Sequence, residues 1–291
     1  MPVLTIRHKT EYCYAKPVSF GEHRVMLRPR DGHDLRVLDL RMTIDPEPIS
    51  LRWIHDVFGN SVGIAKFEGQ SDRLVFQSEA TIEHDPKHGI DLPHDDEAFH
   101  YPFEYEPKEM PDLWRSISRQ YPDRDGTIEA WARQFVNIGT PTTTRDLLTG
   151  ITHAIKQQFT YRGRHDPGVQ LPLETLQLGT GTCRDFALFM IEAVRSLGFA
   201  ARFVSGYLHV RARSGRVGGG STHAWVQVYL PSAGWVEFDP TNGIVGNHDL
   251  IRVAVAREPR QALPLSGTYT GLRSDSIGMK VDIDVIAQAS P

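Results

Sequence analysis

The pattern of apolar and polar positions divides the chain into a strand-rich first part and a mixed second part. From residue 3 to about residue 84, short apolar runs alternate with polar positions and are broken by turn residues, as along residues 35–44. Alternation with a period of two predicts half-buried strands, and residues 58–61 are typical of a turn between two of them. This part is therefore predicted to form an antiparallel β-sandwich.

The pattern changes in the segment that follows. Residues 85–125 contain many prolines among acidic and aromatic residues, too many for regular elements, and are predicted to form a linker. Two helices are expected around residues 127–137 and 143–159, where apolar residues recur at helical spacing. Residues 161–178 have no regular period and contain glycine and proline, so they are expected to form a surface loop of the kind that often frames an active site.

A buried helix is predicted directly after the glycine-rich residues 179–182. Thr182 and Asp185 have the spacing of an N-cap and its acidic partner, and the apolar run that follows ends at Gly198, a plausible C-cap. Cys183 is then in the first turn, where unpaired backbone N–H groups and the helix dipole favour the thiolate. Cysteine is also common as a small buried residue without chemistry, and the helix alone leaves both interpretations open.

Three strands are predicted after this helix, at residues 201–210, 221–230 and 235–239. His223 and Asp239 lie on the two arms of a hairpin that turns at residues 231–234. If Leu230 faces Gly234, the two side chains share a face of the sheet as diagonal neighbours, close enough for the carboxylate to hold the imidazole. A turn with an even number of residues and no bulge would place them on opposite faces.

Length and charge limit the classes of partner. A chain of 291 residues favours two domains, and a formal net charge of −4 with a pI near 6.3 gives no reason to expect nucleic acid or an anionic membrane as a partner. No apolar run approaches the roughly 20 residues of a membrane span, and the first residues have no signal-peptide pattern. We therefore expect a cytoplasmic protein whose partner is a peptide or protein substrate, with the oligomeric state left open.

Cysteine and histidine usage gives no metal or cofactor site. The two cysteines, Cys13 and Cys183, are expected to be free thiols in a reducing compartment. His88, His94 and His100 lie among aspartates in the linker, but their spacing matches no ligand template, so a solvated acidic loop is favoured over metal binding. No metal and no cofactor are predicted.

Three separated motifs resemble those of a known family. Cys183 in residues 181–187, His223 in residues 223–226 and Asp239 in residues 234–242 are similar, in order and with their flanking tryptophans, to the Cys, His and Asp motifs of the bacterial transglutaminase-like superfamily of papain-like cysteine enzymes. Segments of the first 60 residues resemble the β-rich N-terminal region of the bacterial branch. Residues 253–258 and 267–271 resemble its C-terminal extension.

The resemblance implies an α+β fold in two domains. Residues 1–115 would hold the β-sandwich and linker. Residues 116–291 would hold the papain-like transglutaminase core, with a Cys-bearing helix packed on an antiparallel sheet, and a C-terminal β extension. The resemblance also implies that Cys183, His223 and Asp239 are nucleophile, base and orienting residue.

The residue types fit amide chemistry. A Cys–His–Asp triad can form a thiolate, attack an amide and pass through a thioester acyl-enzyme, which predicts a cysteine-dependent amide hydrolase of the peptidase or isopeptidase kind. The backbone N–H of Cys183 is expected in the oxyanion hole, with Gln177 or Tyr161 as a candidate side-chain donor. Two alternatives stay open, a protein cross-linking transglutaminase and a non-catalytic peptide-binding module.

Overall fold

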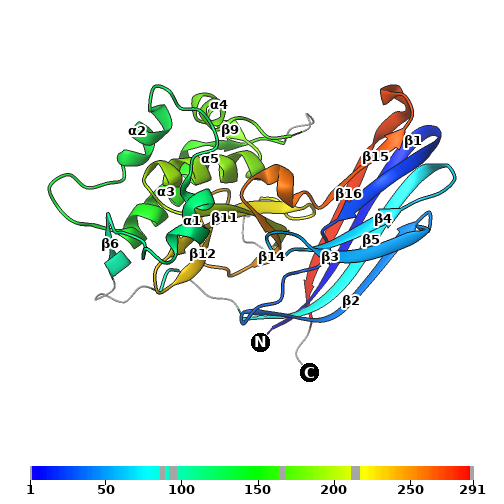
Figure 1. The fold of residues 1–291 in the computed structure, drawn as a ribbon, viewed down its shortest axis with the longest axis horizontal. Coiled ribbons are helices and arrows are strands. Elements are labelled where there is room, and N and C mark those ends of the chain that lie inside the picture. Colours follow the sequence, from blue (N-terminus) through cyan, green and yellow to red (C-terminus); the bar gives the residue numbers. More distant parts are fainter. Residues whose placement is uncertain (1, 86–88, 92–96, 164–167, 211–216, 289–291) are drawn as a thin grey trace.

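The chain folds into two lobes, one rich in strands and one with helices packed on a sheet (Figure 1). A computed structural model describes residues 2–85, 89–91, 97–163, 168–210 and 217–288. Among these residues, no helix combines the length and apolar character that crossing a bilayer requires.

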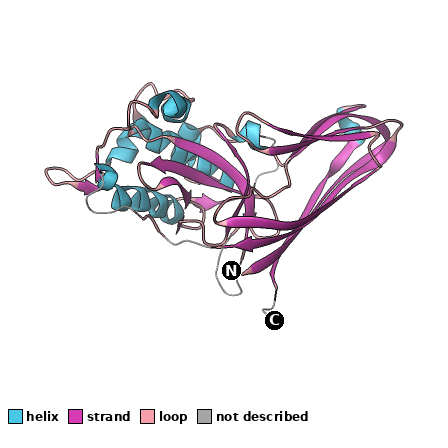
Figure 2. Cartoon of the chain, turned by 60° about the horizontal axis from the view of Figure 1, so that its bottom comes forward, coloured by secondary structure: helices cyan, strands magenta, loops and turns pink. Residues whose placement is uncertain are grey.

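The first lobe is a curled antiparallel sheet built around one long strand (Figure 2). Its order is β2-β5-β1-β4-β3, and β15 and β16 also pair with β1, so that β5 and β16 flank the first half of β1 while β4 and β15 flank the second. The predicted strand-rich first part is confirmed, and its two halves share β1. The strands are β1 (Val3–Val25), β2 (Leu35–Asp45), β3 (Ser50–His55), β4 (Ser61–Lys66), β5 (Ser71–His84), β15 (Leu265–Thr270) and β16 (Ser276–Ala287).

The C-terminal β extension, expected with residues 116–291, pairs into this first sheet, and the division of the chain at residue 115 stays a prediction. Strand β16 pairs with β1 from Leu4 opposite Ala287 to Tyr14 opposite Ser276. The alternating side chains of residues 276–287 are typical of a strand, but they do not indicate which strand pairs with it. The partner, β1, lies at the other end of the sequence.

The second lobe is a five-stranded antiparallel sheet covered by helices. Its order is β13-β12-β11-β10-β14. The strands are β10 (Ala201–Leu208), β11 (His223–Leu230), β12 (Gly234–Asp239), β13 (Ile244–Val245) and β14 (Leu250–Ala256). Helix α5 (Cys183–Ser196) packs on this sheet, where Phe186 and Phe189 share one buried core with Val226 and Val228. The predicted core of a Cys-bearing helix on an antiparallel sheet is confirmed.

The remaining helices surround α5. Helices α2 and α3 correspond to the two predicted ones, whereas α1 and α4 lie in segments predicted to be irregular. Both of the latter have a proline in the first turn, Pro111 and Pro172, which is tolerated there because the missing N–H would have no partner within the helix. The helices are α1 (Met110–Ile117), α2 (Thr127–Arg133), α3 (Thr144–Gln158) and α4 (Pro172–Leu178), with short 3₁₀ turns η1 (Glu97–Phe99), η2 (Pro259–Ala262) and η3 (Arg273–Asp275).

Two short strand pairs connect segments of the second lobe. Strand β6 (His100–Tyr101) pairs with β7 (Thr142–Thr143), which ties the linker to the start of α3. Strand β8 (Thr160–Tyr161) runs parallel to β9 (Thr180–Gly181), directly before the Cys183 helix. The end of α3 is thereby fixed next to the start of α5.

The three histidines of the linker were the candidates for a metal site in the sequence. His88 and His94 lie outside the described residues, while His100 is exposed in β6. Within the described part of the chain, no group of three His, Cys, Asp or Glu side chains could hold a metal ion. The acidic-loop interpretation of the segment from His88 to His100 stays a prediction.

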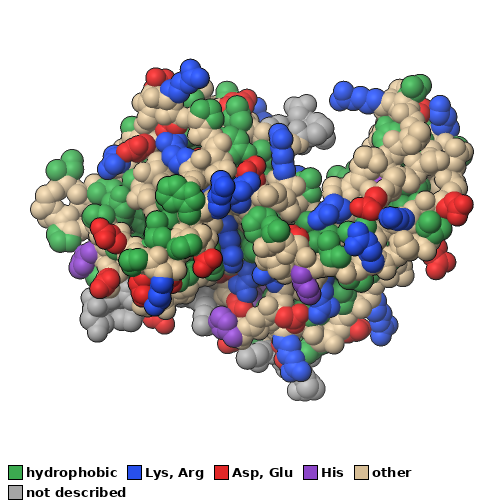
Figure 3. All heavy atoms as spheres, in the orientation of Figure 1, with side chains coloured by type: hydrophobic (Ala, Val, Ile, Leu, Met, Phe, Trp, Pro, Cys, Tyr) green, Lys and Arg blue, Asp and Glu red, His purple; other side chains and the backbone are tan. Residues whose placement is uncertain are grey.

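A buried ion pair joins the lobes. Arg252 of β14 donates to Asp34 of the first lobe at 2.6 Å and to Glu237 of β12 at 2.6 Å. Asn60 inserts its amide against Val255, donating to the carbonyl and accepting from the N–H at 2.8 and 2.9 Å. Lys and Arg side chains also gather along the junction of the lobes in Figure 3. These contacts hold the sheet of the first lobe against the second.

Candidate active site

Cys183 is the first residue of α5, as predicted. Asp185 fixes this helix start, because its Oδ2 accepts from the backbone N–H of Thr182 at 2.8 Å and from the Thr182 hydroxyl at 2.9 Å. The thiol is buried, with 6% of the residue exposed. Both cysteines of the chain are free. A thiol at this helix end lies where the dipole stabilises its anion.

The hairpin brings His223 and Asp239 together. Leu230 faces Gly234 across a turn of three residues, which is the register that the prediction required. His223 Nε2 lies 2.8 Å from Asp239 Oδ2, and neither side chain is exposed to solvent. The predicted meeting of these two side chains is confirmed.

Asp239 is held as an anion by several donors. Its Oδ2 accepts from His223 and from Asn242 Nδ2 at 2.8 Å each, and its Oδ1 accepts from the backbone N–H of Thr241 at 2.9 Å. Burial works to raise the pKa of this carboxyl, but His223, Asn242 and Thr241 outweigh it and hold the pKa below its usual value. The carboxylate is therefore ionised at neutral pH.

The imidazole of His223 is stabilised in its protonated form. Burial disfavours the charge, but Asp239 and the nearby Cys183 outweigh burial and raise the pKa of the ring. Nδ1 is buried and has no hydrogen-bond partner among the described residues. The Cys183 thiol nevertheless lies near enough to the ring to contribute to its raised pKa. Catalytic hydrogen bonds are often long before substrate binds. Nδ1 is thus the nitrogen open to the proton of Cys183.

The two candidate oxyanion donors lie in different surroundings. Tyr161 in β8 is paired with Gly181, two residues before Cys183, and burial followed by the nearby Cys183 raises the pKa of its hydroxyl. The hydroxyl therefore keeps its proton at neutral pH. Gln177 is exposed on α4. The structure brings Tyr161 to the site and leaves Gln177 at the surface.

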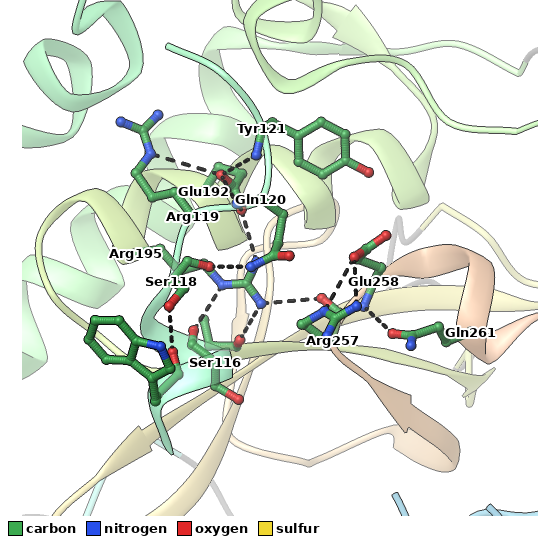
Figure 4. A network of polar contacts seen from close by, with 12 residues as sticks. Ser116, Ser118, Arg119, Gln120, Tyr121, Glu192, Arg195, Arg257, Glu258 and Gln261 are labelled. Carbon is green, nitrogen blue, oxygen red and sulfur yellow. Dashed lines mark hydrogen bonds and ion pairs between the residues drawn. The ribbon is translucent and has the colours of Figure 1, made fainter. Parts of the chain in front are cut away.

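A buried polar network fixes α5 to the rest of the lobe (Figure 4). Glu192 accepts from the backbone N–H groups of Gln120 and Tyr121 and from Arg195 Nη1, at 2.9 to 3.2 Å for the shortest bond of each donor. Arg195 also donates to the carbonyls of Ser116 and Ala201, both at 2.9 Å. The helix that presents Cys183 is thereby anchored to the linker and to β10.

Sequence reasoning missed one residue of the site, Asn242. Asn242 is the last residue of the Asp239 motif, residues 234–242, and this position is the one feature of the sequence that could indicate it. Its amide contacts both the Asp239 carboxylate and the backbone of Val217. A side chain in a loop acquires such partners only from the fold.

Family models match both lobes. Residues 4–83 match the bacterial transglutaminase-like N-terminal region, and residues 129–240 match the transglutaminase-like superfamily. The second match spans Cys183, His223 and Asp239. The chain thus carries one segment that matches the bacterial transglutaminase-like N-terminal region and one that matches the transglutaminase-like superfamily. Its second lobe is accordingly a transglutaminase-like core, and the family suggested by the sequence motifs is confirmed.

The similarity to known proteins extends over the whole chain. An uncharacterized protein of Mycobacterium leprae is 26% identical over 98% of this chain and 99% of its own length. An uncharacterized protein of Mycobacterium tuberculosis is 27% identical over 96% of this chain and 91% of its own length. The arrangement of a β-rich lobe before a transglutaminase-like core is therefore shared with whole proteins.

A solved structure shares the fold. The "Putative Cysteine Protease" of Cytophaga hutchinsonii superimposes with a TM-score of 0.74 at 18% identity, covering 100% of this chain and 92% of that chain. At this identity the likeness shows the fold alone. The predicted α+β class with an N-terminal β region and a transglutaminase-like core is confirmed.

Proposed function

We propose that this chain is a cysteine-dependent amide hydrolase that cleaves a peptide or isopeptide bond. The observation that carries the proposal is the buried 2.8 Å contact between His223 Nε2 and Asp239 Oδ2, formed beside a cysteine at a helix N-terminus. A neutral structural histidine would not need a buried carboxylate on one nitrogen and a thiol near the other.

The proposed steps use these three side chains. Nδ1 of His223 takes the proton of Cys183, and the thiolate attacks the amide carbonyl. The imidazolium then protonates the leaving amine as the C–N bond breaks, which leaves a thioester. Water attacks the thioester, gives a proton to the ring and releases the acid and the thiolate. Asp239 stays ionised throughout and holds the ring.

The oxyanion of each tetrahedral intermediate needs donors. The backbone N–H of Cys183 is one, because the first N–H groups of a helix have no partner within it. The Tyr161 hydroxyl is the side-chain donor that we favour over Gln177, since Tyr161 lies beside the site and stays protonated. The proposed oxyanion hole therefore joins β8 to α5.

Two other functions use the same residues. A cross-linking transglutaminase would pass the acyl group to a lysine amine instead of water, and a peptide-binding module would bind a peptide at this site without chemistry. A peptide or protein is the proposed partner in every case, with no role for nucleic acid or membrane. We also propose a cytoplasmic location, where the two free thiols would stay reduced.

A substrate screen separates these functions. Wild-type protein, Cys183→Ala and a Cys13→Ala control are incubated with peptide, isopeptide and amine-acceptor substrates. Cleavage that is lost in Cys183→Ala and kept in Cys13→Ala supports the hydrolase, and amine incorporation with that pattern supports cross-linking. Alkylation at Cys183 no faster than at Cys13 between about pH 6 and 7 would indicate a binding module.

A further inference from the structure

Asn242 lies between Asp239 and a segment of backbone that covers His223. It is buried, and Nδ2 donates to Asp239 Oδ2 at 2.8 Å and to the Val217 carbonyl at 3.1 Å. Its Oδ1 accepts from the Val217 N–H at 2.9 Å. The side-chain amide therefore joins the carboxylate to this backbone and holds Val217 as a neighbouring strand would.

Asn242 is itself held in place through its backbone. Lys156 of α3 donates from Nζ to the Asn242 carbonyl at 2.6 Å. The backbone N–H of Asn242 points to Asp239 Oδ1 at 3.3 Å. The backbone of Asn242 is therefore fixed by Lys156 and Asp239, while its side-chain amide is bonded to Asp239 and Val217.

The segment held by Asn242, residues 217–220, is called the strap here. It passes against the imidazole, because a Cβ on Gly218 would lie 2.8 Å from His223 Nδ1 and 3.3 Å from Cε1. Nδ1 is the atom that exchanges a proton with Cys183 in the proposed mechanism. Only a residue without a side chain can approach this closely, and the φ of +101° at Gly218 is also one that other residues rarely adopt.

We propose that Asn242 is a positioning residue, which fixes Asp239 and the strap around His223 so that Nδ1 faces Cys183. The proposal rests on the hydrolase mechanism above and adds to it. Asn242 Nδ2 lies 3.5 Å from His223 Nε2, on the side of the ring that faces Asp239, so Asn242 acts through Asp239 and His223. Gly218 supplies the second wall of the imidazole site.

The test is the alkylation rate of Cys183 by iodoacetamide across pH, in a Cys13→Ala background that leaves one thiol. Asn242→Ala removes the donor to the carboxylate and both bonds to the strap. Gly218→Ala places a methyl group against Nδ1. Since small misplacement of a catalytic group can cost about 10²-fold, each variant is expected to lower the rate between about pH 5 and 7 by about that factor.

Matched controls separate positioning from general damage. Gly69→Ala introduces a side chain at a φ of +80°, in the turn between β4 and β5, where nothing lies within 4 Å, so it carries a comparable backbone penalty outside the site. Asn137→Ala removes an exposed amide that donates to the Pro141 carbonyl. Both controls are expected to react like the parent protein.

A second measurement keeps the proposal testable if one variant fails to fold. Nitrogen-15 NMR of the His223 ring reports its tautomer and protonation, and Asn242→Asp retains an acceptor for the Val217 N–H while losing both donors. We expect Asn242→Asp and Gly218→Ala to alter the ring signals and Gly69→Ala to leave them unchanged. Parent-like rates and ring signals in the folded Asn242 variants would overturn the positioning role. A parent protein without reactivity below about pH 7 would overturn the hydrolase mechanism as well.

Discussion

At the scale of single residues, His223 has a different neighbour at each ring nitrogen. Nε2 faces the Asp239 carboxylate, Nδ1 lies against Gly218, and the Cys183 thiol is near enough to raise the pKa of the ring. Because the carboxylate accepts from Nε2, Nδ1 is the nitrogen that exchanges a proton with the thiol and holds that proton in the imidazolium. The direction of proton transfer follows from which nitrogen the carboxylate holds.

The pH dependence of thiol reactivity follows from this pairing. The raised pKa of His223 keeps the ring protonated through neutral pH, and the imidazolium stabilises the thiolate over that range. Alkylation of Cys183 should therefore persist well below the roughly 8.5 pKa of an ordinary cysteine. In His223→Ala the profile should move toward 8.5, as measured by alkylation rate against pH. An unchanged profile would rule out the pairing.

His223 and Asp239 should act as one unit in turnover. Asp239→Ala should lower turnover on a cleavable peptide without abolishing the reactivity of the thiol, because the carboxylate only orients the ring. Adding Asp239→Ala to His223→Ala should then cost little more than His223→Ala alone. Losses that multiply would show independent roles, and melting curves check that each variant is folded.

At the scale of elements, the position of α5 depends on a buried ion pair in its C-terminal part, formed by Glu192 and Arg195. Glu192 and Arg195 are wholly buried and bonded to each other at 2.9 Å, and Glu192 also receives two backbone N–H groups of the linker. Removing one partner of a buried pair leaves the other charge without compensation. The linker and the helix are thus mutually dependent.

The expected cost of Glu192→Ala is about 3–5 kcal/mol in the free energy of unfolding. Glu129→Ala is the matched control, because Glu129 pairs with Arg133 on the exposed surface of α2 and should cost about 0.3–0.5 kcal/mol. Denaturant unfolding of both variants measures the difference. Equal losses in the free energy of unfolding would mean that the buried pair stabilises the protein no more than the exposed one.

Local signals in the sequence carried much of the site. The start of α5 follows from Thr182 and Asp185, three residues apart, and the register of His223 with Asp239 follows from the length of one turn. Both depend on close neighbours in the chain. The helix at Pro172 and the contacts of Asn242 depend on tertiary packing, for which the same residues give no local signal. The pairing of β16 with β1 cannot be predicted from local signals either, because the two strands lie at opposite ends of the sequence.

At the scale of the whole molecule, the lobes share a buried ionic contact. Asp34 is held by Arg252 and by Asn247, and Arg252 continues to Glu237 in the core sheet. Burial works to raise the pKa of Asp34, but Arg252 outweighs it and lowers the pKa. The acid therefore stays charged at neutral pH and keeps the lobes joined.

Asp34→Ala should weaken this junction and separate the unfolding of the lobes. We expect a loss of about 3 kcal/mol, because Arg252 loses one of its two buried partners. Calorimetry should resolve two transitions in Asp34→Ala, and we expect a single transition in the parent. The control is Glu79→Ala, whose pair with Arg7 is exposed, so its unfolding should match that of the parent. One unchanged transition in Asp34→Ala would contradict the prediction.

The pairing of β1 with β16 also sets how the molecule responds to force. Leu4 lies opposite Ala287, so a pull on both ends of the chain acts on the same end of two antiparallel strands. Such a load breaks their hydrogen bonds one at a time, like a zipper, instead of shearing all of them together. We expect an unfoldase that pulls on the C-terminal end of β16 to detach this strand from β1 first, before α5 and the core sheet that hold Cys183 and His223 unfold.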